Sequence, residues 1–238
     1  MAMNYFAING VKSTDVGIVV KELPPPVLAA PRMAFQEIPG MDGSLTILER
    51  DEEDGLVYSD YTVTALCYMK DLTRLNEAAA FLARSGDIYV PNRPGGHYRG
   101  RITGQVPIEQ IMKGRPQREF EVMFRMHPFW YADDVSNITL TAAGNVANPG
   151  NVHSEPIITV TGNGNIILYV HDYAVFITGL SGSVTLDCSL KLAYSGTALK
   201  NGIVKMETAW PRLKPGGNYI TWSGNVSKVV IEPRWRYR

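Results

Sequence analysis

Cysteine is scarce in this sequence, and long apolar runs are missing from it. Cys67 and Cys188 are the only cysteines, and they lie far apart, without CxxC spacing. Two such residues cannot build a disulfide framework or, alone, a structural zinc site, so nothing points to secretion. No run approaches the roughly 18 apolar residues of a membrane-spanning helix, and "MAMNYFAING" lacks the basic and apolar segments of a signal peptide. We expect a protein that is made in a reducing cytoplasm and does not insert into a membrane.

Neither sign of charge is in excess, because 23 Lys and Arg residues balance 23 Asp and Glu residues. General binding to nucleic acid usually requires a strongly basic surface, so we expect no sequence-specific nucleic-acid partner. The charges are unevenly placed, however: residues 49–54 read "ERDEED" and the chain ends in "EPRWRYR". A solvated acidic loop and a basic tail are the simpler interpretation, and complementary docking between subunits is the alternative.

Recognisable catalytic and ligand-binding motifs are also absent. No serine lies in a GxSxG elbow, and no HExxH or other metal-ligand spacing connects the four histidines, which are His97, His127, His153 and His171. The run "ERDEED" lacks the alternating ligands and the glycine of a calcium-binding EF-hand loop, which favours a charged hairpin tip. We therefore expect no enzyme activity, no catalytic residue, no metal and no cofactor.

Residues 161–165, "TGNGN", contain a Gly-x-Gly pair after an apolar run. The phosphate-binding version of this pattern must open a helix, whose N–H groups meet the anion. Here another apolar run, "IILYV", follows at once, so the spacing predicts a hairpin in which residues 162–165 turn the strand back. Similar turns are expected at "LSGS", "KPGGN" and "WSGN".

The pattern of the chain changes near residue 135, where we place a domain boundary. Residues 1–135 are expected to be α+β with a predominance of strand, including alternating strands at 60–69 and 118–127. One helix is expected near 71–85, capped by Asp71 and ended by Gly86. Its spacing predicts a buried face made of Leu72, Leu75, Ala79 and Leu82. Residues 136–238 show only short β-rich runs between turns, which is typical of an antiparallel β-sandwich.

The second half also holds Trp210, Trp222 and Trp235. Exposed tryptophans on a β-sandwich can stack on sugar rings, which would make this half a carbohydrate-binding module. The simpler interpretation is that the three rings fill the core or an interface, where large aromatic side chains contribute most buried area.

Six stretches, taken in order, resemble the distal tail protein family of long-tailed bacteriophages. They span nearly the whole chain and read "FAINGVKSTDVGIVV", "IPGMDGSL", "HPFW", "NPGNVHSEPIITVTGNGNI", "WPRLKPGGNYITWSGN" and "IEPRWRYR". The resemblance implies a mainly β fold with two parts: a β-barrel-like ring domain with one helix, then a galectin-like β-sandwich. The sequence departs from the family at Met41, where arginine often precedes the Asp-Gly turn, and it has no room for the carbohydrate-binding insertion of some members.

The resemblance also implies a function and partners. Distal tail proteins form a homo-hexameric ring at the end of the tail tube, in the virion, and contact the tail tube protein and the tail-tip protein. In some phages the C-terminal domain holds receptor-binding proteins. The family is not known for catalysis or a required cofactor. The alternative is an adhesion module that binds the bacterial surface through the three tryptophans, and a hydrolase is a more remote third interpretation.

Ring contacts can be proposed from the residues. A closed ring needs a heterologous interface, and edge strands with unpaired backbone groups are natural material for it. The proline-rich stretch at residues 22–32 cannot form a central strand or a helix, which predicts an extended arm. We expect interface residues in that stretch and in the "IPGMDG" turn: Pro24, Pro25, Pro26, Pro39, Gly40, Asp42 and Gly43.

Overall fold

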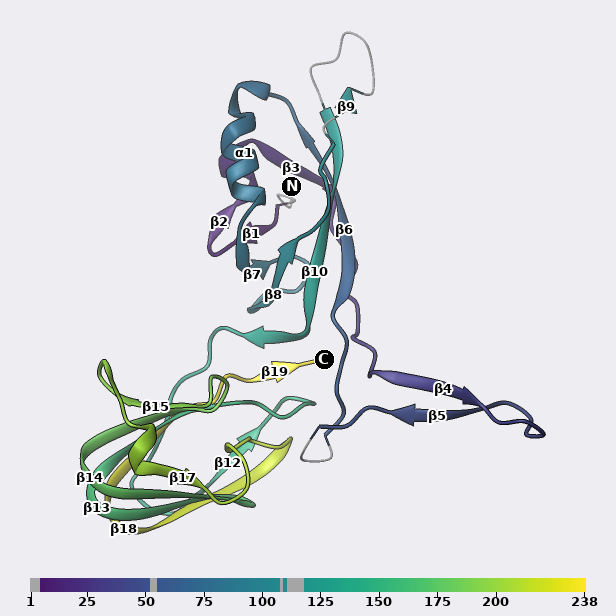
Figure 1. Cartoon of the computed structure of the whole chain (residues 1–238). Helices are drawn as coiled ribbons and strands as arrows, with labels where there is room; N and C mark the ends of the chain where they lie inside the picture. Colours follow the sequence, from purple (N-terminus) through teal and green to yellow (C-terminus); the bar gives the residue numbers. More distant parts are fainter. Residues whose placement is uncertain (1–4, 52–54, 108, 111–117) are drawn as a thin grey trace. The chain divides into compact units, whose positions relative to one another are not determined.

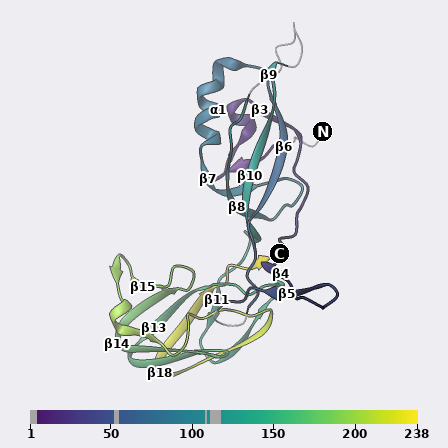
Figure 2. The same ribbon diagram turned by 45° about the vertical axis from the view of Figure 1, so that its right-hand side comes forward.

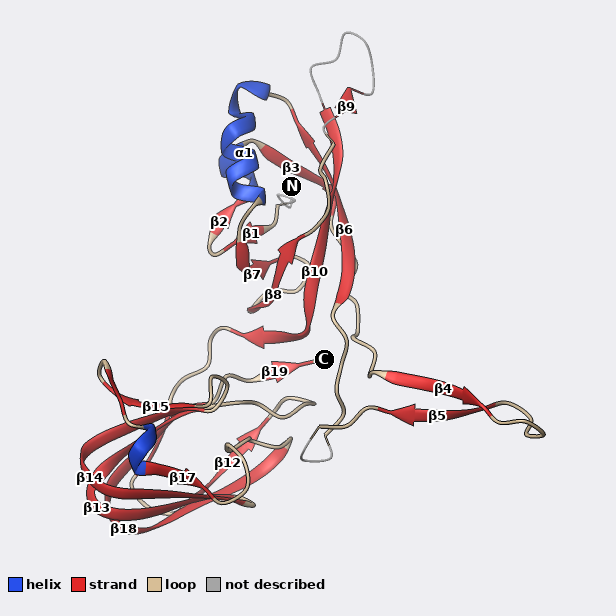
Figure 3. Ribbon diagram, viewed as in Figure 1, coloured by secondary structure: helices blue, strands red, loops and turns tan. Residues whose placement is uncertain are grey.

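The computed structural model describes residues 5–51, 55–107, 109–110 and 118–238. Part of the acidic run, residues 52–54, therefore lies outside the described residues. The chain divides into two compact units, Met1–Trp130 together with Arg238, and Tyr131–Tyr237. Strands dominate both units, so the predicted mainly β class is confirmed (Figure 3). None of the described helices is long and apolar enough to cross a membrane.

The first unit is built on one antiparallel sheet with strand order β2-β1-β7-β8-β10-β6-β3 (Figure 1). Its strands are β1 (Ala7–Ile8), β2 (Val11–Lys12), β3 (Ile18–Glu22), β6 (Tyr61–Met69), β7 (Ser85–Tyr89), β8 (Gly96–Ile102) and β10 (Arg118–Ala132). Two short strands, β9 (Glu109–Gln110) and β19 (Arg236–Tyr237), pair with β10. A separate two-stranded sheet consists of β4 (Met33–Glu37) and β5 (Ser44–Leu48).

The strands β6 and β10 carry the alternation that the sequence predicts. They pair from Arg118 opposite Met69 to Met126 opposite Tyr61. Alternate side chains of β10 point to the core and are at most 4% exposed: Phe120, Val122, Phe124 and Met126. The intervening residues from Glu119 to His127 are polar or exposed, so the sheet has one buried and one open face.

One α-helix covers the core side of this sheet, but its limits and its buried face differ from the prediction. A 3₁₀ turn, η2 (Leu72–Arg74), precedes α1 (Leu75–Leu82), and the Asp71 carboxylate caps the turn by accepting from the Thr73 N–H at 2.9 Å. Gly86 lies within β7 and does not end the helix. The buried residues of α1 are Ala78 and Phe81, because the Phe81 ring stacks on Phe6 at 5.6 Å in the core.

The second unit is one eight-stranded sheet. Six of its strands follow the order β11-β18-β13-β14-β15-β16, and the other two, β12 and β17, pair with β18 and β14. Its strands are β11 (Ile138–Leu140), β12 (Gly144–Asn148), β13 (Ile157–Val170), β14 (Tyr173–Asp187), β15 (Leu192–Ser195), β16 (Ala198–Leu199), β17 (Val204–Met206) and β18 (Gly216–Glu232). The 3₁₀ turns η1 (Ser13–Val16) and η3 (Asn201–Ile203) complete the elements of the two units.

Three glycine-rich stretches lie in the middle of long strands, where the sequence predicts hairpin turns. Residues 161–165 continue β13 without a turn, and the pairing with β14 only shifts register between Gly164 and Ile166. The turn that follows β13 lies at His171 and Asp172, and His171 has a φ of 52°. The prediction that this stretch turns the chain back was therefore wrong. The stretches "LSGS" and "WSGN" likewise lie entirely inside β14 and β18, so the turns predicted there were also wrong.

Glycine is required at these bends because the strands approach closely. A Cβ on Gly162 would lie 2.3 Å from the Asn225 carbonyl oxygen, and a Cβ on Gly224 would lie 2.4 Å from the Asn165 carbonyl oxygen. The register also places Gly162 opposite Gly182. The three long strands β13, β14 and β18 thus bend together, as strands do when they pass from one layer to another through bulges (Figures 1 and 2).

The two halves of the bent sheet enclose a single core. β11 pairs with the C-terminal part of β18 and β12 with its N-terminal part, while β15 and β17 pair with opposite ends of β14. The core receives side chains from both halves, including Val160, Leu168, Val184 and Ile220, each 0% exposed. Two layers exist, as in the expected sandwich, but the same three strands run through both.

Candidate assembly interface

The strands β4 and β5 form a hairpin arm, defined here as residues 33–48, which the described part of the chain leaves uncovered. They pair with each other from Met33 opposite Leu48 to Glu37 opposite Ser44, and with no other described strand. Every residue of both strands is exposed. An isolated two-stranded hairpin is marginally stable in water, so an arm of this kind calls for an external partner.

The arm carries apolar side chains on both of its faces. Met33, Phe35 and Leu48 share one face, because residues opposite each other in a ladder point the same way. Leu45 and Ile47 lie on the other face. Together with the tip, seven large apolar residues are between 39% and 64% exposed: Met33, Phe35, Ile38, Met41, Leu45, Ile47 and Leu48. Exposed apolar side chains gathered on one hairpin in this way mark an interaction site.

Backbone hydrogen bonds hold the base of the arm. The Arg32 N–H donates to the Val57 carbonyl at 2.7 Å, the Val57 N–H to the Glu49 carbonyl at 3.1 Å, and the Glu49 N–H to the Arg32 carbonyl at 3.0 Å. The side chains of Arg32 and Glu49 also form an ion pair at 3.4 Å. Three segments of the chain therefore meet at the base of the arm and are hydrogen-bonded to one another.

The predicted turn residues Pro39, Gly40, Asp42 and Gly43 lie together at the tip of the arm. Gly40 and Gly43 have φ values of 83° and 79°, a conformation that glycine adopts without strain. The Met41 N–H donates to the Ile38 carbonyl at 3.1 Å and closes the first part of the turn. The sequence thus located the end of the arm, and the role of these residues in an interface stays a prediction.

The three consecutive prolines are placed differently from the arm tip. Pro24 is buried, and its carbonyl oxygen accepts a hydrogen bond from the Asn92 amide at 2.8 Å, whereas Pro25 and Pro26 are exposed. They line a small depression whose other walls include Tyr61 and Tyr98. Pro24 therefore anchors the segment that leads to the arm, and only Pro25 and Pro26 offer surface to a partner.

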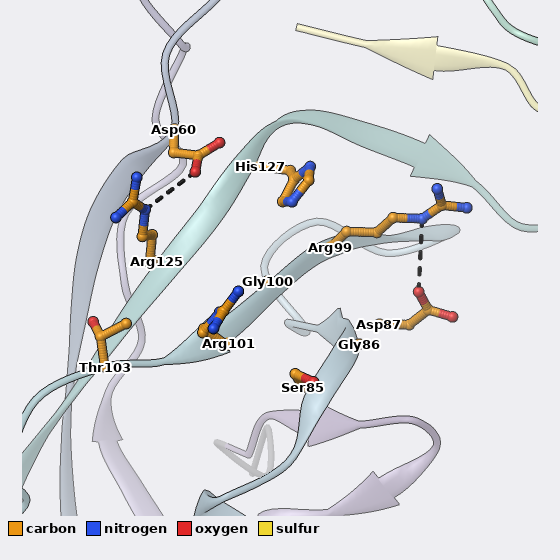
Figure 4. A pocket seen from close by; sticks show the side chains of 10 residues that line it. All are labelled: Asp60, Ser85, Gly86, Asp87, Arg99, Gly100, Arg101, Thr103, Arg125 and His127. Atoms are coloured by element: carbon orange, nitrogen blue, oxygen red, sulfur yellow. Dashed lines mark hydrogen bonds and ion pairs between the residues drawn. The ribbon is translucent and has the colours of Figure 1, made fainter. Parts of the chain in front are cut away.

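A groove of about 560 Å³ runs along the open face of the first unit's sheet (Figure 4). Its cations are Arg99 and Arg101 from β8 and Arg125 from β10, with His127 beside them. Two aspartates line the same groove: Asp60 lies 3.1 Å from Arg125, and Asp87 lies 3.9 Å from Arg99.

A second groove of about 520 Å³ adjoins the first at Thr103. Its lining is more apolar and includes Leu66, Phe120 and Met123. Glu119 and Glu121 also line it, and Glu119 pairs with Lys21 at 3.2 Å. The open face of the sheet therefore has a cationic end and an apolar end with carboxylates.

The three tryptophans of the proposed glycan face belong to the core of the second unit. Trp235 is 7% exposed, and Trp210 and Trp222 are partly buried and pack against the same core. Trp222 lies in β18 opposite Leu168 of β13. The rings thus contribute to packing, and little of Trp235 is available to a sugar.

The described residues hold neither a metal-binding cluster nor a cysteine with a lowered pKa. No group of three or more His, Cys, Asp or Glu side chains among them is placed to hold a metal ion. Burial raises the pKa of the Cys67 thiol to about 12, and burial also raises the pKa of the Cys188 thiol. Both thiols are therefore protonated at neutral pH, which makes them poor nucleophiles.

The sequence predicted the turn at the tip but not that the strands beside it expose apolar side chains on both faces. The signal was present in "MAFQE" and "SLTIL", in which apolar residues occupy both odd and even positions. Such a run ordinarily indicates a strand buried on both faces inside a protein. Only the structure shows that no part of the described chain covers it.

A solved structure shares this fold. No family model matches the sequence, and no curated protein matches it. The crystal structure of the SPP1 Dit protein (gp 19.1), described as a paradigm of the hub adsorption apparatus in phages that infect Gram-positive bacteria, matches with a TM-score of 0.74 at 16% sequence identity, over 96% of this chain and 98% of that one. The resemblance to distal tail proteins that the sequence indicates is thereby confirmed at the level of the fold.

Proposed function

We propose that this chain is a structural subunit of a bacteriophage tail, which assembles as a homo-hexameric ring at the distal end of the tail tube. The ring would join the tail tube protein to the tail-tip protein, and the second unit, galectin-like in this interpretation, would point outward and hold receptor-binding proteins. The match to a phage hub protein over nearly the whole chain supports this role. The virion tail is then the site of function, and no enzyme activity or cofactor is required.

The observation that carries assembly is the hairpin arm with its two apolar faces. In a heterologous ring each subunit donates one surface and receives a different one, so an exposed arm with a hydrogen-bonded base is suited to reach the next copy. Burying a large apolar side chain completely contributes about 1.5–3 kcal/mol, so covering the exposed half of seven such residues contributes roughly 5–10 kcal/mol. That gain is of the same order as the cost of association, about 4–15 kcal/mol.

Mass measurement in solution tests this proposal. Light scattering on the full-length chain over a range of concentrations should show a species of six times 26.3 kDa, with an annular image in negative-stain microscopy. Replacing residues 33–48 by a short Gly-Ser linker should abolish the ring and leave thermal unfolding of both units nearly unchanged. A control with the exposed hairpin tip at residues 196–199 replaced in the same way should still assemble. A wild-type chain that stays a monomer at every concentration, with and without the tail tube and tail-tip proteins, would refute the proposal.

A further inference from the structure

We propose that the cationic groove on the open sheet face of the first unit, with Arg101 at its centre, receives the acidic tip of the hairpin arm from a second copy of this chain. This inference rests on the proposed ring and names the surface that receives each arm.

The groove has a positive charge that the described part of the chain leaves without a partner. Arg99 and Arg125 each have an aspartate nearby, at 3.9 Å and 3.1 Å. Arg101 is exposed and has no hydrogen-bond or ion-pair partner among the described residues. Three arginines against two aspartates leave one positive charge in excess. Since like charges on neighbouring strands destabilise a sheet, an additional anion in this groove would stabilise it (Figure 4).

The arm has the complementary charge. Residues 33–48 contain two ionisable side chains, Glu37 and Asp42, and no Lys, Arg or His. Neither carboxylate has a side-chain partner among the described residues. Both lie in the distal part of the arm, at the end of β4 and in the tip. A surface with an unpaired guanidinium therefore meets one with two unpaired carboxylates, which is the complementarity that sets partner and orientation at interfaces.

The order of apolar and charged residues is also the same on the two surfaces. Beyond its tip the arm presents Phe35, on the same face as Glu37. Beyond Thr103 the cationic groove continues into the groove lined by Leu66 and Met123. Met123 is 44% exposed although it lies in the middle of β10. The strands of the arm would cover this apolar part while the tip lies at Arg101.

The carboxylates of the apolar groove fix the direction of docking. Glu121 lines this groove and has no partner among the described residues, whereas Glu119 is paired with Lys21. Glu121 would repel the tip of an arm laid the other way round. Like charges placed against each other at an interface suppress the wrong arrangement.

Charge reversal in the full-length chain tests the contact. Arg101→Glu and Asp42→Arg each place like charges together, so each should raise the concentration for half-assembly at least about tenfold. Because both side chains are exposed and without partners among the described residues, the midpoint of thermal unfolding should not change. Lys228→Glu, on an exposed side chain of the second unit, is the charge-matched control and should assemble as the wild type does.

Mixing the two single variants in equal amounts separates a contact between copies from one within a copy. In an alternating ring, the groove of each subunit with the Arg101→Glu change receives the tip of a neighbour with the Asp42→Arg change. The groove of that neighbour still holds Arg101, and it receives a tip that still holds Asp42. Every contact is then between opposite charges, and a ring of six accommodates the alternation. The mixture should therefore recover assembly close to the wild-type concentration.

The outcomes distinguish this inference from the proposed function. If both single variants assemble like the wild type while the chain without its arm stays monomeric, the arm binds elsewhere, and the inference fails although the ring stands. If the mixture of the two single variants does not assemble but the chain that carries both Arg101→Glu and Asp42→Arg does, the contact lies within one copy and the inference is overturned. If the wild type never assembles, the proposed function and the inference fail together.

Discussion

Substitution of Phe35 in the arm should weaken assembly without weakening the fold. Phe35 is 64% exposed in the isolated chain, the largest exposed fraction among the large apolar residues of the arm. Its ring lies on the same face of the hairpin as Met33 and Leu48. Replacement by alanine therefore removes surface that only a partner can bury, and it leaves the backbone pairing of the arm intact.

The magnitude follows from the exposed fraction. Complete burial of a phenylalanine side chain contributes about 1.5–3 kcal/mol, so covering the exposed two-thirds contributes roughly 1–2 kcal/mol at each contact between copies. In a closed ring each subunit donates one arm, so each subunit loses one such contribution. Since about 1.4 kcal/mol corresponds to a factor of ten, Phe35→Ala should raise the concentration for half-assembly roughly 5- to 30-fold.

Light scattering at a series of concentrations measures this shift, and thermal unfolding of the same samples at low concentration measures the fold. Leu199→Ala is the matched control, because Leu199 is 70% exposed but lies on β16 of the second unit. The control should leave assembly unchanged. If Phe35→Ala assembled at the wild-type concentration, or if Leu199→Ala produced the same shift, burial of the arm would not drive assembly.

Two predictions concern the fold. Gly224→Ala should destabilise the second unit by more than about 2 kcal/mol in a urea titration, because φ is 93° and the new Cβ would lie 2.4 Å from the Asn165 carbonyl oxygen. Gly202→Ala, with nothing within 4 Å of the added Cβ, is the control and should be close to neutral in the same titration. The free energy of unfolding should also fall as the pH rises above about 8.5, because cysteines of the unfolded chain ionise there while burial holds the Cys67 pKa at about 12. The loss should amount to at most about 1.4 kcal/mol per pH unit for each thiol. Urea midpoints at pH values of about 7, 9 and 10 should show this loss, and Cys67→Ala should make it shallower; an equal loss in that variant would contradict the assignment.

The alternating strands of the first unit could be predicted because their signal is local. In β6 and β10 the residues that face the core alternate with residues that face outward, so the two-residue repeat of apolar side chains in the sequence matches the pattern of burial. The helix was predicted for a similar reason, but the buried face predicted for it was wrong. Leu72 and Leu75 are 41% and 40% exposed, whereas Phe81 is 1% exposed because it contacts Phe6, a residue far away in the sequence.

The bent sheet could not be predicted from local pattern, because glycine and asparagine have the same local preference in a turn and in a bulge. The stretch "TGNGN" satisfies both. What distinguishes them is the partner: Gly162 lies opposite Gly182, and its missing side chain leaves room for the Asn225 carbonyl oxygen. Three glycine-rich stretches that look like three separate turns are one bend in space.

Backbone hydrogen bonds hold the base of an arm whose strands are fully exposed. An apolar hairpin with free edges is an aggregation hazard, and a heterologous contact that fails to close produces open chains of subunits. The angle at which the arm leaves the first unit decides which of these forms. The ladder that joins Arg32, Glu49 and Val57 holds the segments at the base of the arm together with three backbone hydrogen bonds, which side-chain substitutions leave in place. In the proposed ring, the strength of each contact therefore depends on the side chains of the arm, while the backbone pairing at the base is kept when those side chains are changed.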